Sequence, residues 1–169
     1  PPFMTEEDFL KQDETAQNIV TSTELLSIPK LPKRLTIIGA GVIGMEFASA
    51  FSAFGSEVTV IEFMKECLPP IDSDIAKRLR KILEKRGVTF YMQSAVKKIV
   101  SPSESEQTHT TVIFDKKGKE TSVETDLVLI ATGRQANIDN IGLESTGIET
   151  NGRGVVVNDN METNIKGIY

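Results

Sequence analysis

Three glycines at a fixed spacing are the residues of this chain best suited to hold a phosphate group. Gly39, Gly41 and Gly44 form a Gly-x-Gly-x-x-Gly pattern after the apolar run 35–38. The first glycine permits a sharp turn, the second lets a phosphate approach the backbone, and the third allows close helix packing. An acid, Glu62, ends a second apolar run about 20 residues later. This order of strand, turn, helix, strand and acid predicts a dinucleotide site.

The two ends of this unit offer different contacts. Free N–H groups near Val42 and Ile43, together with the positive end of the helix dipole, would face the pyrophosphate. Glu62 would accept hydrogen bonds from the adenosine ribose hydroxyls and repel a 2′-phosphate. At ~5 Å and an effective dielectric constant of ~20, each like-charge pair costs roughly 3 kcal/mol. We therefore expect NAD(H) rather than NADP(H), and expect Glu62→Arg to shift the preference towards NADP(H). The alternative is a glycine-rich turn without a ligand.

Helices and strands alternate through the first part of the chain. The pattern predicts strands at 35–38, immediately before Glu62 and at 88–91, with a helix at about 43–54 that Gly55 ends. Asp72 or Ser73 can cap a second helix. The positions expected to face the core are Ile43, Phe47, Ala48, Phe51 and Phe54 in the first helix, and Ile75, Leu79, Ile82 and Leu83 in the second.

From residue 96 onwards the pattern changes to short strands. Segments 96–100, 108–114 and 119–124 read as an antiparallel meander with a turn at 116–118 and a polar loop at 101–107, and 127–130 reads as a strand buried on both faces. A further strand is expected at 155–158. The predicted fold class is α/β: a Rossmann-like parallel sheet with helices on one face and a three-stranded antiparallel β-meander as a crossover on the other. Residues 1–33, with a capping box at 21–24, form the expected lead-in, and 34–169 the domain.

Composition narrows the function further. The 169 residues carry a net charge of −5, which gives no electrostatic reason to expect nucleic acid. No apolar run approaches the ~20 residues of a membrane span, and no signal peptide is visible. Cys67 is the only cysteine, which is compatible with a cytoplasmic location, and we expect neither a redox role for it nor a metal site. We interpret His109 as an ordinary strand residue and the basic residues at 77–81 as a solvated helix face.

Several motifs in order resemble one family. The motifs are the unit from Gly39 to Glu62, the segment Leu68-Pro69, the meander, Ala131-Thr132-Gly133-Arg134 and the final residues 164–169. Together they resemble the pyridine nucleotide-disulfide oxidoreductases, most of all their dihydrolipoamide dehydrogenase branch. The resemblance implies an NAD domain inserted between two parts of an FAD domain and followed by an interface domain. It places the redox cysteines outside this chain, whose start without Met looks cut from something longer. It also implies a homodimeric parent that can form part of a 2-oxo acid dehydrogenase complex.

The resemblance also implies roles for single residues. Gly39, Gly41, Val42, Ile43 and Gly44 would hold the pyrophosphate, Glu46 the nicotinamide carboxamide, Glu62 the ribose, Phe63 and Val96 the adenosine side, and Gly133 the nicotinamide side. No residue here is expected to be catalytic, because the implied task is to position nicotinamide against FAD for hydride transfer. For Glu46 the alternative is an exposed polar residue without a ligand.

Two alternatives to this function stay open. One is the NAD domain of a family member with another second substrate, such as an NADH oxidase, a coenzyme A-disulfide reductase or a mercuric reductase. The other is a nucleotide-binding module without a catalytic parent.

Overall fold

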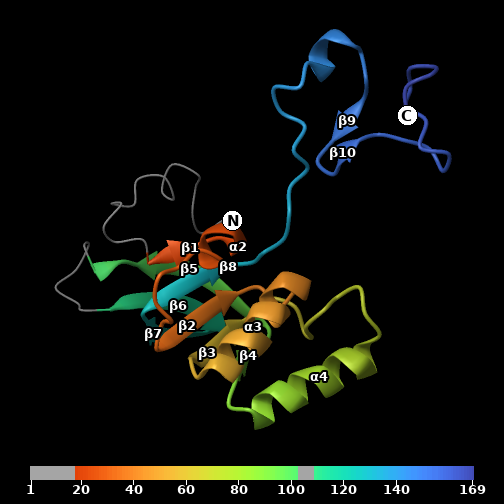
Figure 1. Ribbon diagram of the computed structural model, residues 1–169. Coiled ribbons are helices and arrows are strands. Elements are labelled where there is room, and N and C mark those ends of the chain that lie inside the picture. Colours follow the sequence, from red (N-terminus) through yellow and green to blue (C-terminus); the bar gives the residue numbers. More distant parts are fainter. Residues whose placement is uncertain (1–17, 103–108) are drawn as a thin grey trace. The chain divides into compact units, whose positions relative to one another are not determined.

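The computed structural model describes residues 18–102 and 109–169 (Figure 1). The chain forms two compact units, one ending at Thr132 and the other spanning Gly133–Tyr169. Most of the expected lead-in, and most of the expected loop at 101–107 with the start of the strand at 108, lie outside the described residues. Within the described ranges, no helix has the length and apolar character needed to cross a membrane.

A five-stranded parallel sheet organises the first unit. Its order is β1 (Ile19–Val20), β8 (Leu127–Ile130), β2 (Arg34–Ile38), β3 (Glu57–Ile61) and β4 (Thr89–Tyr91), and every neighbouring pair is parallel (Figure 1). The apolar runs of β2, β3 and β8 are almost entirely buried, as expected for strands covered on both faces. The edge strand β1 comes from the expected lead-in, after which the capping box at Thr21 starts α2 (Ser22–Leu25).

Helix α3 (Val42–Phe54) packs on one face of this sheet, and its bounds agree with the sequence prediction. Its inward residues are Gly44, Met45, Ala48 and Phe51. The expectation for Phe54 is wrong, because its side chain is 67% exposed. Ala48 points to the sheet, and Phe54, six residues later, lies about 120° round the helix from it.

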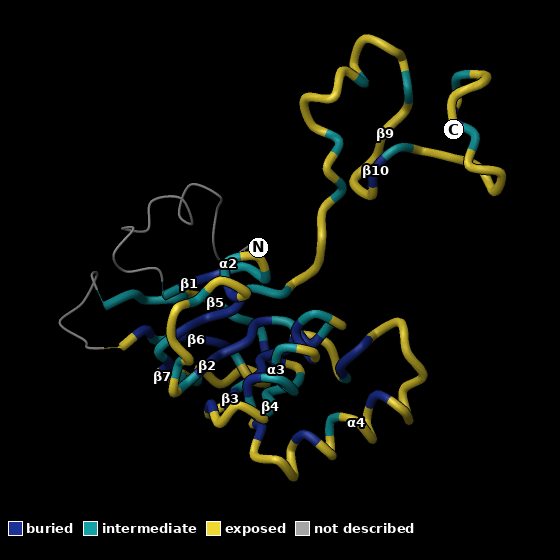
Figure 2. Tube along the Cα trace, in the orientation of Figure 1, coloured by how far each residue is buried: buried dark blue, intermediate teal, exposed yellow. Residues whose placement is uncertain are grey.

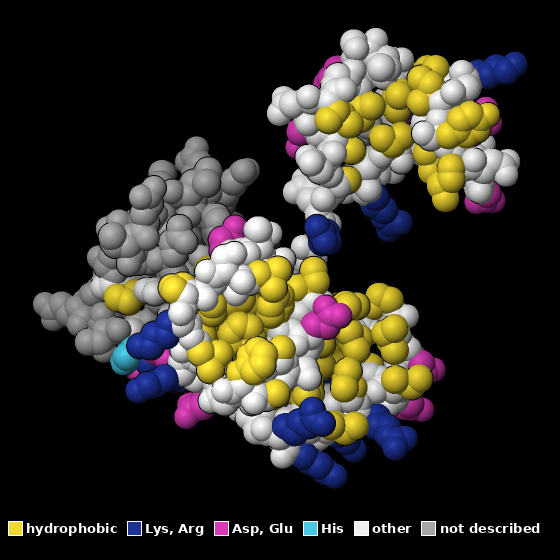
Figure 3. Space-filling view, viewed as in Figure 1, with side chains coloured by type: hydrophobic (Ala, Val, Ile, Leu, Met, Phe, Trp, Pro, Cys, Tyr) yellow, Lys and Arg dark blue, Asp and Glu magenta, His cyan; other side chains and the backbone are white. Residues whose placement is uncertain are grey.

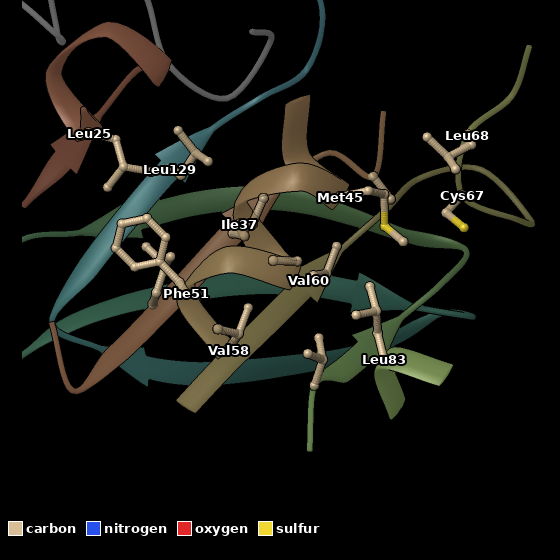
Figure 4. Close-up of a cluster of buried hydrophobic side chains, with 14 of the residues drawn as sticks. Leu25, Ile37, Met45, Phe51, Val58, Val60, Cys67, Leu68, Leu83 and Leu129 are labelled. Atoms are coloured by element: carbon tan, nitrogen blue, oxygen red, sulfur yellow. The ribbon is translucent and has the colours of Figure 1, made fainter. Parts of the chain in front are cut away.

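Helix α4 (Ser73–Lys85) contributes Ala76 and Leu83 to the same core, which Figure 4 shows in close-up. Leu83 was predicted to face inward, but the predictions for Ile75, Leu79 and Ile82 are wrong, since these are 63%, 36% and 42% exposed. Ala76 and Leu83 are seven residues apart and so share one side of the helix. Because this side of the helix faces the core, the stripe of Ile75, Leu79 and Ile82 is left partly exposed to solvent.

The antiparallel meander covers the opposite face of the sheet. It consists of β5 (Ser94–Val100), β6 (Thr110–Lys116) and β7 (Lys119–Thr125), with a turn at Lys117 and Gly118, both at positive φ. Val112 and Phe114 of β6 pack with Ile38, Ile61 and Val128 of the parallel sheet. The predicted fold class is therefore confirmed, with helices on one face and the meander on the other.

The second unit has little buried surface (Figure 2). It contains a 3₁₀ turn, η2 (Leu143–Ser145), and a short hairpin of β9 (Thr150–Asn151) and β10 (Gly154–Val155). The prediction of a strand to residue 158 is wrong beyond Val155. The Asn158 side chain instead accepts hydrogen bonds from the backbone N–H groups of Asn160 and Glu162, which turns the chain.

Candidate functional site

The register of the sheet aligns the carboxyl ends of three neighbouring strands. Ile38 pairs with Ile61 on one side and with Ile130 on the other. The turns that follow are joined as well, because Gly39 N–H donates to Ile61 O at 2.9 Å. Ligands of open parallel sheets bind beyond this edge of the strands.

The fold itself explains the first and third glycines of the turn. Gly39 has φ +104°, and a Cβ there would lie 2.5 Å from the backbone oxygen of Ala131. A Cβ at Gly44 would lie 2.0 Å from the backbone oxygen of Gly39. Both distances are shorter than any normal contact, so neither position has room for a side chain.

The second glycine differs from the other two. Gly41 has φ −71°, which any residue adopts, and no described atom beyond its chain neighbours and the helix backbone lies within 4 Å of a Cβ placed there. The packing of this chain therefore does not require glycine at this position. It leaves open space beside the backbone at the start of α3.

The start of α3 also lacks a cap. Gly41 is the N-cap residue, and since glycine has no side chain it offers no oxygen to accept a capping hydrogen bond from the first turn within residues 18–102 and 109–169. The first turn contains no acid, and Val42 is 53% exposed. The unpaired N–H groups and the positive end of the helix dipole thus face open space, where an anion is favoured.

Glu62 lies beside this turn and is only 8% exposed. Its Oε2 accepts a hydrogen bond from Ala40 N–H at 2.5 Å, and its Oε1 accepts one from Met64 N–H at 2.7 Å. The sequence indicates an acid at this place but gives no sign that its carboxylate binds the glycine turn. Each carboxylate oxygen can accept a second hydrogen bond, so acceptor capacity for a hydroxyl remains.

The other two residues expected on the adenosine side are Phe63, which follows Glu62 directly, and Val96, whose strand is hydrogen-bonded to Glu62 through the backbone. Phe63 is 72% exposed. Val96 is half-buried in β5, and this strand begins at Ser94, whose N–H donates to Glu62 O at 2.9 Å. Gln93 N–H donates to Met64 O at 3.0 Å in the same way. The structure thus connects the segment after β3 with the segment that enters the meander.

The remaining expected residues occupy different places. Ile43 is half-buried and Glu46 exposed on α3, one turn beyond Val42. Gly133 has φ +127° and begins the second unit, so its role stays a prediction.

Two further features bear on chemistry. Burial raises the pKa of Cys67 to about 11, so this thiol is a poor nucleophile at neutral pH. In the part of the chain that the structure describes, no group of three or more His, Cys, Asp or Glu side chains is arranged to hold a metal ion.

Comparison with known proteins adds to this geometry. Residues 3–169 match the family described as pyridine nucleotide-disulphide oxidoreductase. The dihydrolipoyl dehydrogenase of Acholeplasma laidlawii is 40% identical over 151 residues, covering 89% of this chain and 42% of that protein. A leghemoglobin reductase of Glycine max is 37% identical, covering 90% of this chain and 29% of that protein. The chain thus spans less than half the length of these relatives.

Solved structures agree with the sequence relatives. The HOCl-induced flavoprotein disulfide reductase RclA from Escherichia coli superimposes with a TM-score of 0.80 at 33% identity. The match covers 100% of this chain and 36% of that one.

Proposed function

The chain belongs to the pyridine nucleotide-disulphide oxidoreductase family, and from this premise we propose that it is the NAD(H)-binding domain of a flavoprotein resembling dihydrolipoamide dehydrogenase. The observation that carries the proposal is Gly41, the one glycine of the triplet that the packing of the described residues does not require. A glycine that the packing does not need, at the uncapped start of a helix, leaves room for a phosphate group to approach the backbone. We take residues 34–169 as the domain.

The residues present fit such a dinucleotide. Gly41, Val42 and the uncapped N–H groups of α3 would hold the pyrophosphate, and Glu62 the adenosine ribose. Phe63 and Val96 would lie on the adenosine side, and Glu46 and Gly133 on the nicotinamide side. The bound nicotinamide would carry hydride to or from FAD in the complete protein. This chain would bind and orient the dinucleotide without an acid, base or nucleophile of its own.

The partners and location are part of the same proposal. We infer FAD and interface domains in the parent protein, and a homodimeric parent that can form part of a 2-oxo acid dehydrogenase complex. The support is the similarity to dihydrolipoyl dehydrogenases. The expected cytoplasmic location rests on the single, buried cysteine, since the 169 residues cannot form an internal disulfide. A parent with another second substrate remains the alternative.

Titration calorimetry of the 169-residue chain with NAD⁺ and NADP⁺ tests the proposal. We expect NAD⁺ to bind about a hundredfold more tightly, as roughly 3 kcal/mol of like-charge repulsion at Glu62 implies. Equal or tighter binding of NADP⁺ would contradict it. Because Glu62 also accepts from Ala40 and Met64, this comparison is cleaner than a Glu62→Arg variant.

A second measurement concerns turnover. The isolated chain should not reduce lipoamide with NADH, because it has only one cysteine and so cannot form an internal redox disulfide. Measurable turnover would overturn the assignment as a cofactor-binding domain.

A further inference from the structure

The segment that follows β3, residues 62–68, holds the middle of the glycine turn from two sides, and we call it the clasp. Ala40, fully buried, donates its N–H to Glu62 at the start of the clasp, at 2.5 Å. Its carbonyl accepts the N–H of Leu68, at the end of the clasp, at 2.8 Å. Both polar backbone groups of Ala40, its N–H and its carbonyl, are therefore hydrogen-bonded to the clasp.

The clasp is in turn fixed to α4. Arg80 donates to Glu66 in a two-pronged pair, from Nε at 2.7 Å and from Nη2 at 3.0 Å. Both side chains are mostly buried, at 18% and 21% exposure. Arg80 also donates to Glu84 at 2.6 Å, which holds the guanidinium against its own helix.

Two further contacts strengthen this attachment. Glu66 Oε1 accepts the N–H of Cys67 at 3.0 Å, and the Cys67 thiol donates to the carbonyl of Ala76 in α4 at 3.4 Å. Cys67 and Leu68 also enter the core cluster that contains Met45 (Figure 4). The hydrogen bond from Arg80 lowers the pKa of Glu66, so this pair stays charged at neutral pH.

We propose that Arg80 is a positioning residue for dinucleotide binding, which it supports through Glu66 and the clasp although it lies on a different element from the glycine turn. The inference rests on the proposed function and adds a residue outside the binding turn to it. A continuous series of contacts carries it: Arg80 holds Glu66, Glu66 holds the backbone of the clasp, and the clasp holds Ala40. The clasp also presents Glu62, the expected ribose ligand.

Loosening the clasp should weaken binding without removing any ligand contact. If the binding-competent turn is populated only part of the time, the apparent affinity falls by that fraction. Substitutions that act at a distance in this way change binding by about twofold to thirtyfold. The effect should also be visible without nucleotide, as faster exchange of the amide hydrogens of Ala40 and Leu68, whose acceptors are Glu62 and Ala40.

The experiment compares Arg80→Gln with Arg78→Gln in the 169-residue chain. Arg78 is exposed on the same helix, so the second variant makes the same chemical change without touching the clasp. NAD⁺ affinity is measured by calorimetry, and exchange at Ala40 and Leu68 by NMR without nucleotide. We expect Arg80→Gln to bind NAD⁺ about twofold to thirtyfold more weakly and to exchange faster at both amides. Arg78→Gln should match the unaltered chain in both.

Three more variants separate positioning from general loss of stability. Val112→Ala removes buried volume on the opposite face of the sheet and should lower the melting temperature without changing NAD⁺ affinity or exchange at Ala40. Exchanging the charges with Arg80→Glu and Glu66→Arg together should restore much of the affinity that Arg80→Glu alone loses.

The outcomes distinguish this inference from the proposed function. If the unaltered chain binds no NAD⁺, the proposed function fails and this inference fails with it. If the chain binds NAD⁺ and Arg80→Gln behaves like Arg78→Gln, only this inference fails. It is also overturned if Val112→Ala weakens NAD⁺ binding as much as Arg80→Gln does at an equal loss of melting temperature.

Discussion

Helices α3 and α4 both have 13 residues and pack on the same face of the sheet, yet they begin in opposite ways. The side chain of Asp72 caps α4 by accepting the N–H of Asp74 at 2.9 Å, and Asp74 adds a negative charge to the first turn. α3 begins at Gly41 with neither device in the described part of the chain. A side-chain cap typically contributes about 1 kcal/mol, so α3 forgoes stability at the position where an anion would bind.

The outer surfaces of the two helices differ as well. α3 is apolar along most of its length, whereas α4 carries Lys77, Arg78 and Lys81 on its exposed side. Figure 3 shows basic side chains along the edge of the first unit where α4 lies. We infer that α3 leaves its N-terminal end free for a ligand, whereas the capped start and the exposed basic side chains of α4 favour stability and solubility.

The largest expected effect comes from crowding the start of α3. Gly44→Ala should destabilise the chain by several kcal/mol, because the new Cβ would lie 2.0 Å from the oxygen of Gly39. Chemical denaturation measures this change. Gly152→Ala is the matched control, since no described non-neighbouring atom lies within 4 Å of a Cβ there and its φ is ordinary. Equal stability of the two variants would contradict the close packing.

Giving α3 a side-chain cap like that of α4 should raise the stability of the chain and weaken NAD⁺ binding. We expect Gly41→Asp to raise stability by a few tenths of a kcal/mol while weakening NAD⁺ binding by about a hundredfold, since the carboxylate would occupy and repel the pyrophosphate site. Calorimetry and thermal unfolding give the two numbers. Unchanged NAD⁺ affinity in a folded Gly41→Asp chain would remove the main support for a pyrophosphate site.

Removing the cap of α4 should lower the stability of the chain and leave NAD⁺ affinity almost unchanged. Asp72→Ala is expected to cost about 1 kcal/mol of stability, because the N–H of Asp74 loses its acceptor. NAD⁺ affinity should stay within about twofold of the unaltered value, because Asp72 is exposed and makes none of the expected ligand contacts. A large loss of affinity would show that the two helix ends are not separable.

The smallest expected effect is on how the stability of the chain depends on pH. Arg80 lowers the pKa of Glu66 below its ordinary 4.5, so the pair stabilises the folded chain above that pH. This contribution is lost as the pH falls through the lower, folded-state pKa, and amounts to at most about 1 kcal/mol. The melting temperature should therefore fall less steeply between about pH 6 and about pH 3 in Arg80→Gln than in the unaltered chain. Identical slopes would contradict the pairing.

Much of the fold follows from local sequence patterns. The run 127–130 and the helix from Val42 to Phe54 agree with prediction because each depends on its own residues and caps. The inward face of α4 does not follow, since two apolar stripes compete and the burial of Ala76 and Leu83 in the core selects one. Exposed Phe54 is a similar case.

The candidate site divides in the same way. The glycine spacing and Glu62 identify its place from sequence alone. The hydrogen bond between Glu62 and Ala40 joins residues 22 positions apart and exists only because β2 and β3 are in one register. The pair of Arg80 with Glu66 needs a loop of particular shape, for which the sequence contains no pattern.

The place of β8 beside β2 has a consequence for how the glycine turn is made during synthesis. Arg34 and Asp126 bind each other across 92 positions, and the turn at Gly39 closes against the backbone of Ala131. A growing chain can pair β2 with β3 early, but the backbone of Ala131, which packs against Gly39, is present only after β8 has been made. Long-range closure of this kind carries an entropic cost and is slow. We therefore expect the glycine turn, near the beginning of the folded unit in sequence, to be among the last parts of the unit to be completed.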